Sequence, residues 1–428
     1  MKEFSRKINR RLPDLLPALS KVEDPRLRKD YSMEEILMGG IGMFLFKQGS
    51  RNSFNNKRIS DAFSANYQDG FGLRLPHQDT VFDVLEVLDP DKLEKLKMDL
   101  MASQFKQKWL RKYRLLEKYY MVAVDATGVV SFDYPHCDHC LTKTSKSGKV
   151  TWFHYVLEAK LVTSEGHCLS LASEWIENPE GDFVKQDCEQ KAFVRLAAKL
   201  KKQYPRLPMC ILADGLYSNN TVFDICQVND WKYLIVLQDK SLKSIQQDLI
   251  LSKRRIPAVK SYEVKQGMRI SSKYRFESDI PYQKHNLHWL QCVETRKKDV
   301  KPGEKSDKKE EEITFEYITN IPLSKDNVKA LAGGGRLRWK IENEGFNTQK
   351  QGGYELKHKY CRKSYFGMKN CYTLLQIAHL INQLVEKGKV VVAILREHSK
   401  QTIKNIWSNL ISYMLMITPC GSRFRPPP

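Results

Sequence analysis

Three acidic residues lie in sequence surroundings that indicate chemistry. Asp125 interrupts the apolar, β-branched run YMVAVDATGVV, and a buried strand rarely carries an unpaired charge. Asp214 ends a second apolar run, PMCILAD, and Glu342 lies in the helix-periodic segment GRLRWKIENEGF. If the three carboxylates shared a site without a cation, at least one would stay protonated, because like charges raise each other's pKa. Hard divalent cations favour oxygen ligands, so we predict that these three residues bind metal.

This set of ligands suits phosphodiester chemistry. Mg²⁺ fits it, and Mn²⁺ could substitute. Two ions about 3.5 to 4 Å apart would activate a water or a DNA 3′-hydroxyl and stabilise the leaving oxygen during in-line attack. Asp125 would bridge both ions, while Asp214 and Glu342 would bind one each.

The helix around Glu342 carries a cation on the same face. Arg338 lies one turn before Glu342, where it can orient that carboxylate or hold a phosphate in its planar fork. Glu344 faces another direction and is a poor substitute. A surface salt bridge is the alternative for Arg338 and Glu342, and the two strand-end aspartates argue against it.

Composition limits the classes of partner. The chain has 428 residues, long enough for two or three domains, and a formal net charge of +21, which favours a polyanionic partner. Charge alone does not separate DNA, RNA and anionic membrane. No apolar run reaches the roughly 18 residues of a membrane span, and the N-terminus lacks the apolar core of a signal peptide. The scattered cysteines suit a reducing cytosol better than a disulfide framework.

The periodicity of the sequence changes along the chain. Residues 1–115 show period-3.6 apolar spacing with helix start signals such as Ser32 followed by Glu35. We expect a helical DNA-binding region there; a helical subdomain that only packs on the core is the alternative. Residues 116–240 indicate three strands, helix, strand, helix, strand. Asp187 is expected to cap the first of these two helices.

The remaining segments are expected to form an insertion, the rest of the core and a tail. Residues 241–330 alternate like exposed antiparallel strands and predict a β-rich insertion. Residues 331–390 contain the Glu342 helix, and residues 391–428 should form a C-terminal helix and a tail. Basic and aromatic side chains of the insertion could hold a backbone and stack a splayed base, with solvated strand faces as the equal alternative. They are Arg254, Arg255, Arg269, Lys273, Arg275, Tyr262, Tyr274 and Trp289, of which Trp289 is the expected DNA contact.

The element order and three motifs resemble the DDE transposases of bacterial insertion sequences. The motifs are VDATG, ADGLYSN and RWKIENEGFNTQKQGGYELKH. The resemblance covers roughly residues 115–385. It implies an α/β fold with a ribonuclease-H-like core, which is a mixed five-strand sheet with flanking helices. It also implies a helical N-terminal domain and a β-rich insertion between the second Asp and the Glu.

The third motif resembles the Y-R-E-K signature of such transposases, in which Tyr, Arg, Glu and Lys have two, three and six residues between them. Arg338 and Glu342 keep that spacing. The Tyr position is Gly335, and the Lys position is Gln349 with Lys350 next to it. Since the Tyr and Lys of the family contact DNA ends, the resemblance implies that Lys350, together with Arg338, binds DNA.

A cysteine pair follows the first predicted strand. Cys137 and Cys140 have the CxxC spacing of half a zinc site, and no second CxxC exists in the sequence. Reduced cysteines in a loop are therefore the favoured alternative to structural zinc. A zinc ion here would fix the loop after the catalytic strand rather than catalyse. Neighbouring or closing ligands could be His136, His139, His154, His167, Cys168 or Cys188.

Residues and resemblance together predict a DNA transposase that cleaves element ends and joins the 3′-hydroxyl to target DNA. We expect it to bind double-stranded DNA as a homodimer or larger synaptic complex, in the bacterial cytoplasm with the nucleoid and without a membrane partner. A structure-specific nuclease on the same core is one alternative, which would cleave but never join. An inactive transposase-derived DNA-binding protein is another, and the intact Asp, Asp, Glu set argues against it.

Overall fold

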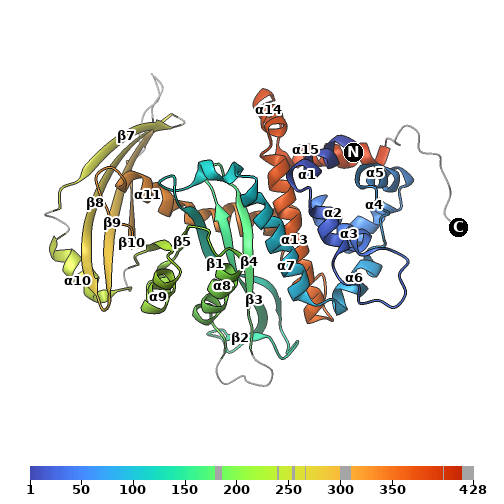
Figure 1. Ribbon diagram of the computed structural model, residues 1–428, viewed down its shortest axis with the longest axis horizontal. Helices are drawn as coiled ribbons and strands as arrows, with labels where there is room; N and C mark the ends of the chain where they lie inside the picture. The colour runs from blue at the N-terminus through green and yellow to red at the C-terminus, as the bar shows by residue number, and fades with distance from the viewer. Residues whose placement is uncertain are drawn as a thin grey trace.

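The computed structural model describes residues 1–178, 186–238, 241–252, 256–265, 267–298, 310–398 and 400–416. They form a mixed α/β fold in which one large mixed sheet is flanked by many helices (Figure 1). The N-terminal helices and the last strands of the sheet lie at opposite ends of an elongated molecule. Within the described residues, no helix is both long enough and apolar enough to cross a lipid bilayer.

Helices make up the first part of the chain. The Ser32 hydroxyl accepts a hydrogen bond from the Glu35 N–H, and the Glu35 carboxylate accepts one from the Ser32 N–H, so the capping box expected there is present. The helices are α1 (Lys2–Arg11), α2 (Leu15–Ser20), α3 (Met33–Leu45), α4 (Arg51–Arg58), α5 (Asp61–Phe71), α6 (Gln78–Val87), α7 (Pro90–Lys106) and the 3-10 turn η1 (Trp109–Tyr113).

The sheet has a mixed centre. Its first strands are β1 (Tyr120–Phe132), β2 (Leu141–Thr144), β3 (Val150–Val162), β4 (Cys168–Ile176), β5 (Met209–Ala213) and β6 (Lys232–Val236). β3 pairs antiparallel with β1, β2 and β4, whereas β1, β5 and β6 are parallel neighbours. The helices α8 (Glu189–Gln203) and α9 (Asn220–Val228) lie between these strands in sequence, as parallel pairing requires a crossover. Every residue of β5 is buried, which fits a strand covered on both faces.

The strands expected as an insertion extend this same sheet. They are β7 (Val259–Lys265), β8 (Met268–Tyr282), β9 (His285–Lys298) and β10 (Glu311–Thr319), and they follow α10 (Lys243–Ser252). β10 pairs antiparallel with β6, and the order β10-β9-β8-β7 leads away from the centre. Arg254 and Arg255, expected as backbone contacts, lie outside the described residues.

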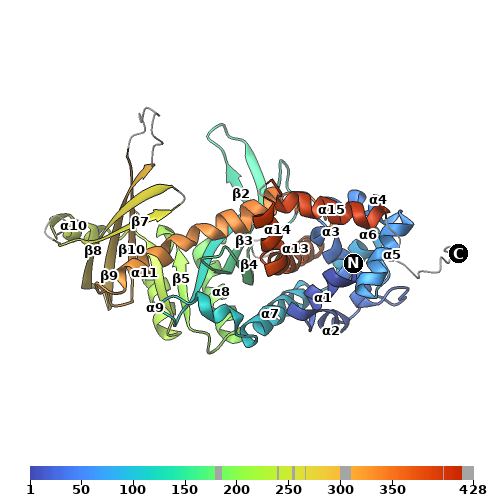
Figure 2. The ribbon, with the colours of Figure 1, turned by 90° about the horizontal axis from the view of Figure 1, so that it is seen from above.

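A long helical segment then returns along the sheet. In Figure 2 it starts at α11 and runs towards the N-terminal helices. It consists of α11 (Val328–Arg336), the 3-10 turn η3 (Leu337–Trp339), the π-helical turn η4 (Ile341–Asn347) and α12 (Thr348–Gln351). The chain ends with α13 (Tyr365–Glu386), α14 (Lys389–Glu397) and α15 (Ile403–Met416). Most of α13 is buried, because it packs on α3, α6 and α7 as well as on β4. The N-terminal helices are thus joined to the sheet through α13.

The start of α8 differs from the prediction. The residue that caps α8 is Cys188, without a side-chain hydrogen bond, so the capping role expected for Asp187 is wrong. The Asp187 carboxylate instead lies 2.6 Å from the Arg195 guanidinium and accepts a hydrogen bond from the Glu177 N–H at 3.3 Å. A bond between the Asp187 carboxylate and a guanidinium joins two full charges, whereas a capping bond to a backbone N–H would involve only one, which accounts for the choice.

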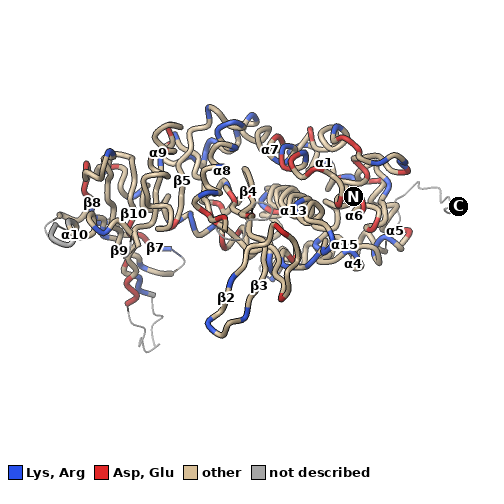
Figure 3. Tube along the Cα trace, turned by 90° about the horizontal axis from the view of Figure 1, so that it is seen from below, with Lys and Arg blue, Asp and Glu red and all other residues tan. Residues whose placement is uncertain are grey.

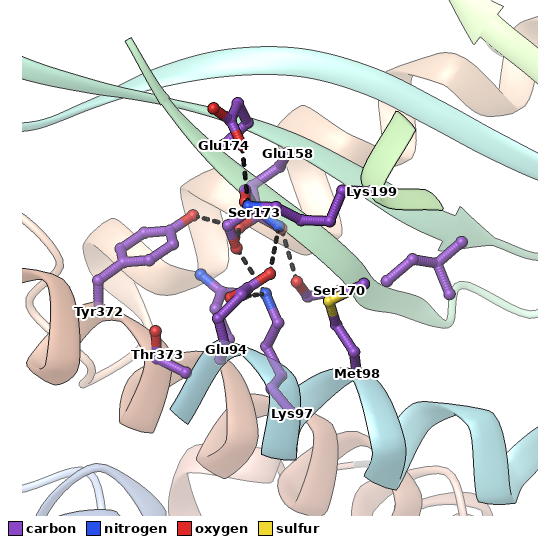
Figure 4. A network of polar contacts seen from close by, with 12 residues as sticks. Glu94, Lys97, Met98, Glu158, Ser170, Ser173, Glu174, Lys199, Tyr372 and Thr373 are labelled. Atoms are coloured by element: carbon purple, nitrogen blue, oxygen red, sulfur yellow. Dashed lines mark hydrogen bonds and ion pairs between the residues drawn. The ribbon is translucent and has the colours of Figure 1, made fainter. Parts of the chain in front are cut away.

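Buried ionic groups connect the helices to the sheet, as Figure 4 shows. Glu158 and Lys160 of β3 are fully buried and lie 3.2 Å apart. The Glu158 carboxylate also accepts hydrogen bonds from the hydroxyls of Ser170 (2.7 Å), Ser173 and Tyr372 (2.9 Å). Ser173 accepts in turn from the ammonium of Lys97, which lies on α7. This buried network therefore joins α7, β3, β4 and α13.

The same network reaches the segment that carries Glu342. The Lys160 ammonium donates to the Gln376 side-chain oxygen at 2.6 Å, and Gln349 of α12 donates to the same oxygen at 2.8 Å. Burial alone raises the pKa of Glu158, but the ammonium groups of Lys160 and Lys97 outweigh burial and hold that pKa below its ordinary value. The carboxylate thus stays charged in the folded protein at neutral pH, and its contribution to stability is lost only as pH falls through the lowered pKa.

Replacing Glu158 by Gln should lower the free energy of unfolding by about 3 to 5 kcal/mol, because the fully buried Lys160 ammonium would lose its carboxylate partner. Urea denaturation at neutral pH measures this. Glu23→Gln is the matched control, since Glu23 also pairs with a lysine, Lys92, but its side chain is 77% exposed. That control should leave the free energy of unfolding close to that of the parent, because exposed ion pairs contribute little. Equal losses in both variants would contradict a role for burial.

Candidate active site

Strand pairing brings the two aspartates to one place. In the parallel pair of β1 and β5, Ala123 lies opposite Leu212, so Asp125 and Asp214, two residues further along each chain, are level with each other. β5 ends at Ala213, and the Asp214 carboxylate accepts the Leu216 N–H at 2.9 Å to start the 3-10 turn η2 (Gly215–Tyr217). Asp214 thus lies at the carboxyl end of its strand, where ligand sites of parallel sheets form.

Glu342 reaches this place from the helical segment. η3 and η4 both contact β1. One guanidinium nitrogen of Arg338, Nη1, lies 3.0 Å from a Glu342 oxygen and 3.7 Å from an Asp125 oxygen. Arg338 is itself buried. The structure therefore gathers Asp125 and Glu342 around a single arginine, one turn before Glu342 as the spacing requires.

The charges of both other carboxylates act on Asp125. Burial raises the pKa of Asp125, the Arg338 guanidinium lowers it, and the carboxylates of Glu342 and Asp214 raise it, so that the net value is about 7. The N–H of Ala126 donates to Asp125 at 2.9 Å. One arginine and one backbone donor thus compensate only part of the cost of this charge.

The π-helical turn sets the directions in which Gln349 and Lys350 face. In an α-helix the residue seven positions after Glu342, Gln349, would share its face, because two turns take about 7.2 residues. A π-helical turn holds an extra residue. Gln349 accordingly turns into the core, where it is fully buried and bonded to Gln376 and His379. Lys350 faces the site. Burial and the charge of Lys357 lower the pKa of Lys350, and the charges of Asp125 and Glu342 raise it.

Packing explains why position 335 is a glycine. A Cβ atom at Gly335 would lie 2.6 Å from the ring of Tyr317 on β10. α11 therefore approaches the sheet too closely at this point for any side chain. Tyr317 is buried and occupies the space that a larger residue would need.

A groove runs beside the carboxylates. Its volume is about 870 Å³, and it extends from Ala126 along β1 and past Leu216. Its lining includes four lysines, which are Lys143, Lys350, Lys357 and Lys359. A positively charged groove next to clustered carboxylates can hold a phosphate backbone over them.

Two residues of this region were not expected from the sequence. Glu189 lines the groove; burial and the nearby Asp214 raise its pKa, while a hydrogen bond from the Tyr217 hydroxyl at 3.1 Å lowers it. Trp339 is 50% exposed, with the Arg338 guanidinium 4.5 Å from its ring centre. An aromatic residue in the charge-rich run RLRWKIENE was a signal for Trp339, whereas no sequence pattern indicated Glu189.

The DNA contact expected at Trp289 is wrong. Trp289 is fully buried, and its indole N–H donates to Glu316 at 3.1 Å. Its neighbour Leu290 is also fully buried, in a core cluster on the opposite face, so β9 is covered on both faces. A ring without an open face cannot stack on a base. Tyr274 is buried as well, whereas Tyr262 is exposed on the distant edge strand β7.

The CxxC cysteines gather with two histidines. The ligand atoms of His136, Cys137, Cys140 and His154 all lie within 4.8 Å of one another. The other ligands considered do not join them. His167 packs between Trp109 and Tyr113, Cys168 is bonded through its backbone to Gln383, and Cys188 is exposed at the start of α8.

No protein-family model matches the chain, and the curated proteins contain no sequence similar to it at a significant level. A function for this site must therefore be argued from the residues and their arrangement.

The raised pKa of Asp125 predicts a pH-dependent cost to stability. In the unfolded chain this carboxyl ionises near pH 3.8, against about 7 in the fold, so ionisation favours the unfolded state increasingly between these values. Without metal, Asp125→Asn should therefore be more stable than the parent at pH 8, by about 2 kcal/mol, and the two should converge towards pH 4. Thermal unfolding in EDTA at several pH values measures this.

The control is Asp133→Asn, because the Asp133 carboxylate directly follows β1, is 73% exposed and pairs with Lys149. It should follow the parent at every pH. Adding Mg²⁺ should stabilise the parent more than Asp125→Asn. A parent that is more stable than Asp125→Asn at pH 8 in EDTA would show that the charge on Asp125 carries no cost.

Proposed function

We propose that this protein is a metal-dependent DNA transposase of the DDE kind, which cleaves DNA ends and joins them to a target. The observation that carries the proposal is the gathering of Asp125, Asp214 and Glu342 from β1, the end of β5 and η4. Such crowding of carboxylates is costly unless a cation is part of the site.

The residues fit a hard divalent cation. They offer carboxylate oxygens, which Mg²⁺ and Mn²⁺ accept, and Arg338 is the only cation that the structure's described ion pairs place on Asp125 or Glu342. Asp125 interacts with both other carboxylates, which suits it to bridge two ions, with Asp214 and Glu342 binding one each. Bound Mg²⁺ ions would supply an activated water or 3′-hydroxyl and stabilise the leaving oxygen.

The chain's own residues orient the reacting groups. Arg338 fixes the Glu342 carboxylate through a 3.0 Å contact and keeps it beside Asp125. Lys350 faces the same carboxylates and, with the other groove lysines, can hold the DNA backbone by its phosphates. Trp339 offers an exposed ring, on which a base at the DNA end could stack.

The succession of elements supports a ribonuclease-H-like core. β1, β3, β4, α8, β5, α9 and β6 follow the expected order of three strands, helix, strand, helix, strand, with only the short β2 added. Asp125 lies in the first of these strands and Asp214 directly after the fourth. The strands β7 to β10 come between Asp214 and Glu342, where the resemblance implies a β-rich insertion.

Positive charge outside the groove suggests the path of the DNA. The hairpin of β2 and β3 projects from the sheet and carries exposed lysines, as Figure 3 shows. They are Lys143, Lys146 and Lys149. We propose a second contact in the N-terminal helices, where α4 carries Arg51 at its start and Lys57 and Arg58 in its last turn. Double-stranded DNA would then be bound by a homodimer or larger synaptic complex.

Activity tests the proposal with a matched pair of glutamates. Asp125→Asn, Asp214→Asn and Glu342→Gln should each reduce Mg²⁺-dependent cleavage and joining by about a hundredfold or more, because each removes a metal ligand. Glu344→Gln should retain activity within a few fold, because Glu344 pairs with Lys340 at 2.6 Å instead. The assay uses DNA that carries the sequences flanking the reading frame, with strand-transfer products separated by electrophoresis.

Each outcome of this assay distinguishes the alternatives. Cleavage without joining would indicate a structure-specific nuclease. DNA binding without either reaction would indicate an inactive DNA-binding protein. Full activity of all three site variants, folded as judged by circular dichroism, would show that the active site lies elsewhere.

A further inference from the structure

Two cysteines and two histidines lie together at the base of the β2–β3 hairpin. We propose that His136, Cys137, Cys140 and His154 bind one structural zinc ion. The Sγ atoms of Cys137 and Cys140 are 3.7 Å apart, and the Nε2 atom of His154 lies 3.4 Å from the first and 3.3 Å from the second.

These distances match the edges of a zinc tetrahedron. Zn–S bonds of about 2.3 Å and Zn–N bonds of about 2.0 to 2.1 Å give edges of about 3.8 Å between sulfurs and about 3.6 Å between sulfur and nitrogen. The three distances within the cluster lie within a few tenths of an ångström of these values. Little movement would therefore be needed to bind the ion.

His136 is held in the orientation that a ligand needs. Its Nε2 lies 2.6 Å from the Arg362 carbonyl oxygen, which makes Nε2 the protonated nitrogen and leaves a lone pair on Nδ1. Nδ1 is buried and has no hydrogen-bond partner among the described residues. The ring also stacks on Phe132, with centroids 3.8 Å apart. Zinc-binding histidines commonly donate their other ring N–H to a carbonyl in this way.

The ligand types select zinc over the magnesium expected at the carboxylates. Two thiolates and two imidazoles in a tetrahedral arrangement suit Zn²⁺, whereas Mg²⁺ requires oxygen ligands and octahedral geometry. A disulfide between Cys137 and Cys140 is the competing state. It would leave the inward-facing nitrogens of both histidines without a partner.

The ion would fix the base of the hairpin. Cys140 directly precedes β2 and His154 lies on β3, one residue beyond the pair Leu141 and Phe153, so the ion would hold both arms. The bond from His136 to Arg362 adds the segment before α13. On the proposed function, this attachment sets the direction in which the hairpin lysines meet DNA. The zinc site itself does not depend on that function.

Metal content tests the proposal directly. The full-length chain, purified under reducing conditions without chelator, should contain about one zinc per chain by mass spectrometry. Cys140→Ser should lose most of it. His139→Asn is the matched control, because His139 belongs to the same loop but stacks on Tyr365 instead of joining the cluster. A parent without zinc that also fails to take up added Zn²⁺, or equal zinc loss in both variants, would overturn the proposal.

Cobalt substitution keeps the test valid even where Cys140→Ser does not fold. Parent protein stripped of metal should bind one Co²⁺ and develop the strong visible bands and thiolate charge-transfer band of a tetrahedral site with sulfur ligands. Only the weak absorption of six-coordinate Co²⁺ would overturn the proposal. Neither this readout nor zinc content depends on DNA cleavage, so a failed zinc site and a failed active site are distinguishable.

Removal of zinc should also loosen the hairpin. With Mg²⁺ in excess, a zinc-selective chelator should increase backbone hydrogen exchange in residues 141–153 while exchange in the fully buried strand β5 stays unchanged. Unchanged exchange in the hairpin of a zinc-loaded parent after chelation would show that the ion does not fix it.

Discussion

The repulsion between three carboxylates is the constraint that the rest of the site must satisfy. Asp125 is held in a strand where burial, Glu342 and Asp214 all disfavour its charge, and Arg338 compensates only part of this. The register of β1 with β5 and the contact of η4 with β1 bring the backbone positions of these residues together. A site built in this way is short of positive charge, which a divalent cation would supply.

The buried network around Glu158 and Lys160 explains how the fold maintains that crowding. Lys160 bonds to Gln376 of α13, and Gln376 in turn accepts from Gln349 directly after the π-helical turn. The Lys160 side chain also packs beside Gly345, within η4 itself. Stability and site geometry therefore depend on the same polar contacts, so a change in this core should also affect the position of Glu342.

The sequence predicted those features of the site that one residue and its immediate neighbours in the chain can indicate. Asp125 was found because a charge within a buried strand is costly, and the order of strands and helices followed from periodicity. The features that the sequence could not predict depend on tertiary packing. Trp289 lies in a strand covered on both faces, although its alternation resembled an exposed strand. The π-helical turn that directs Lys350, and the strand pairing that brings His154 to the cysteines, leave no mark in local sequence.

We thus propose two kinds of ligand set, oxygen at the three carboxylates for the chemistry and sulfur with nitrogen at the base of the hairpin. The most direct test of the central claim is anomalous diffraction from crystals soaked in Mn²⁺, recorded at the manganese absorption edge. We predict anomalous density bonded to oxygens of Asp125, Asp214 and Glu342. Mn²⁺ bound at other places, with none at these carboxylates, would contradict the account.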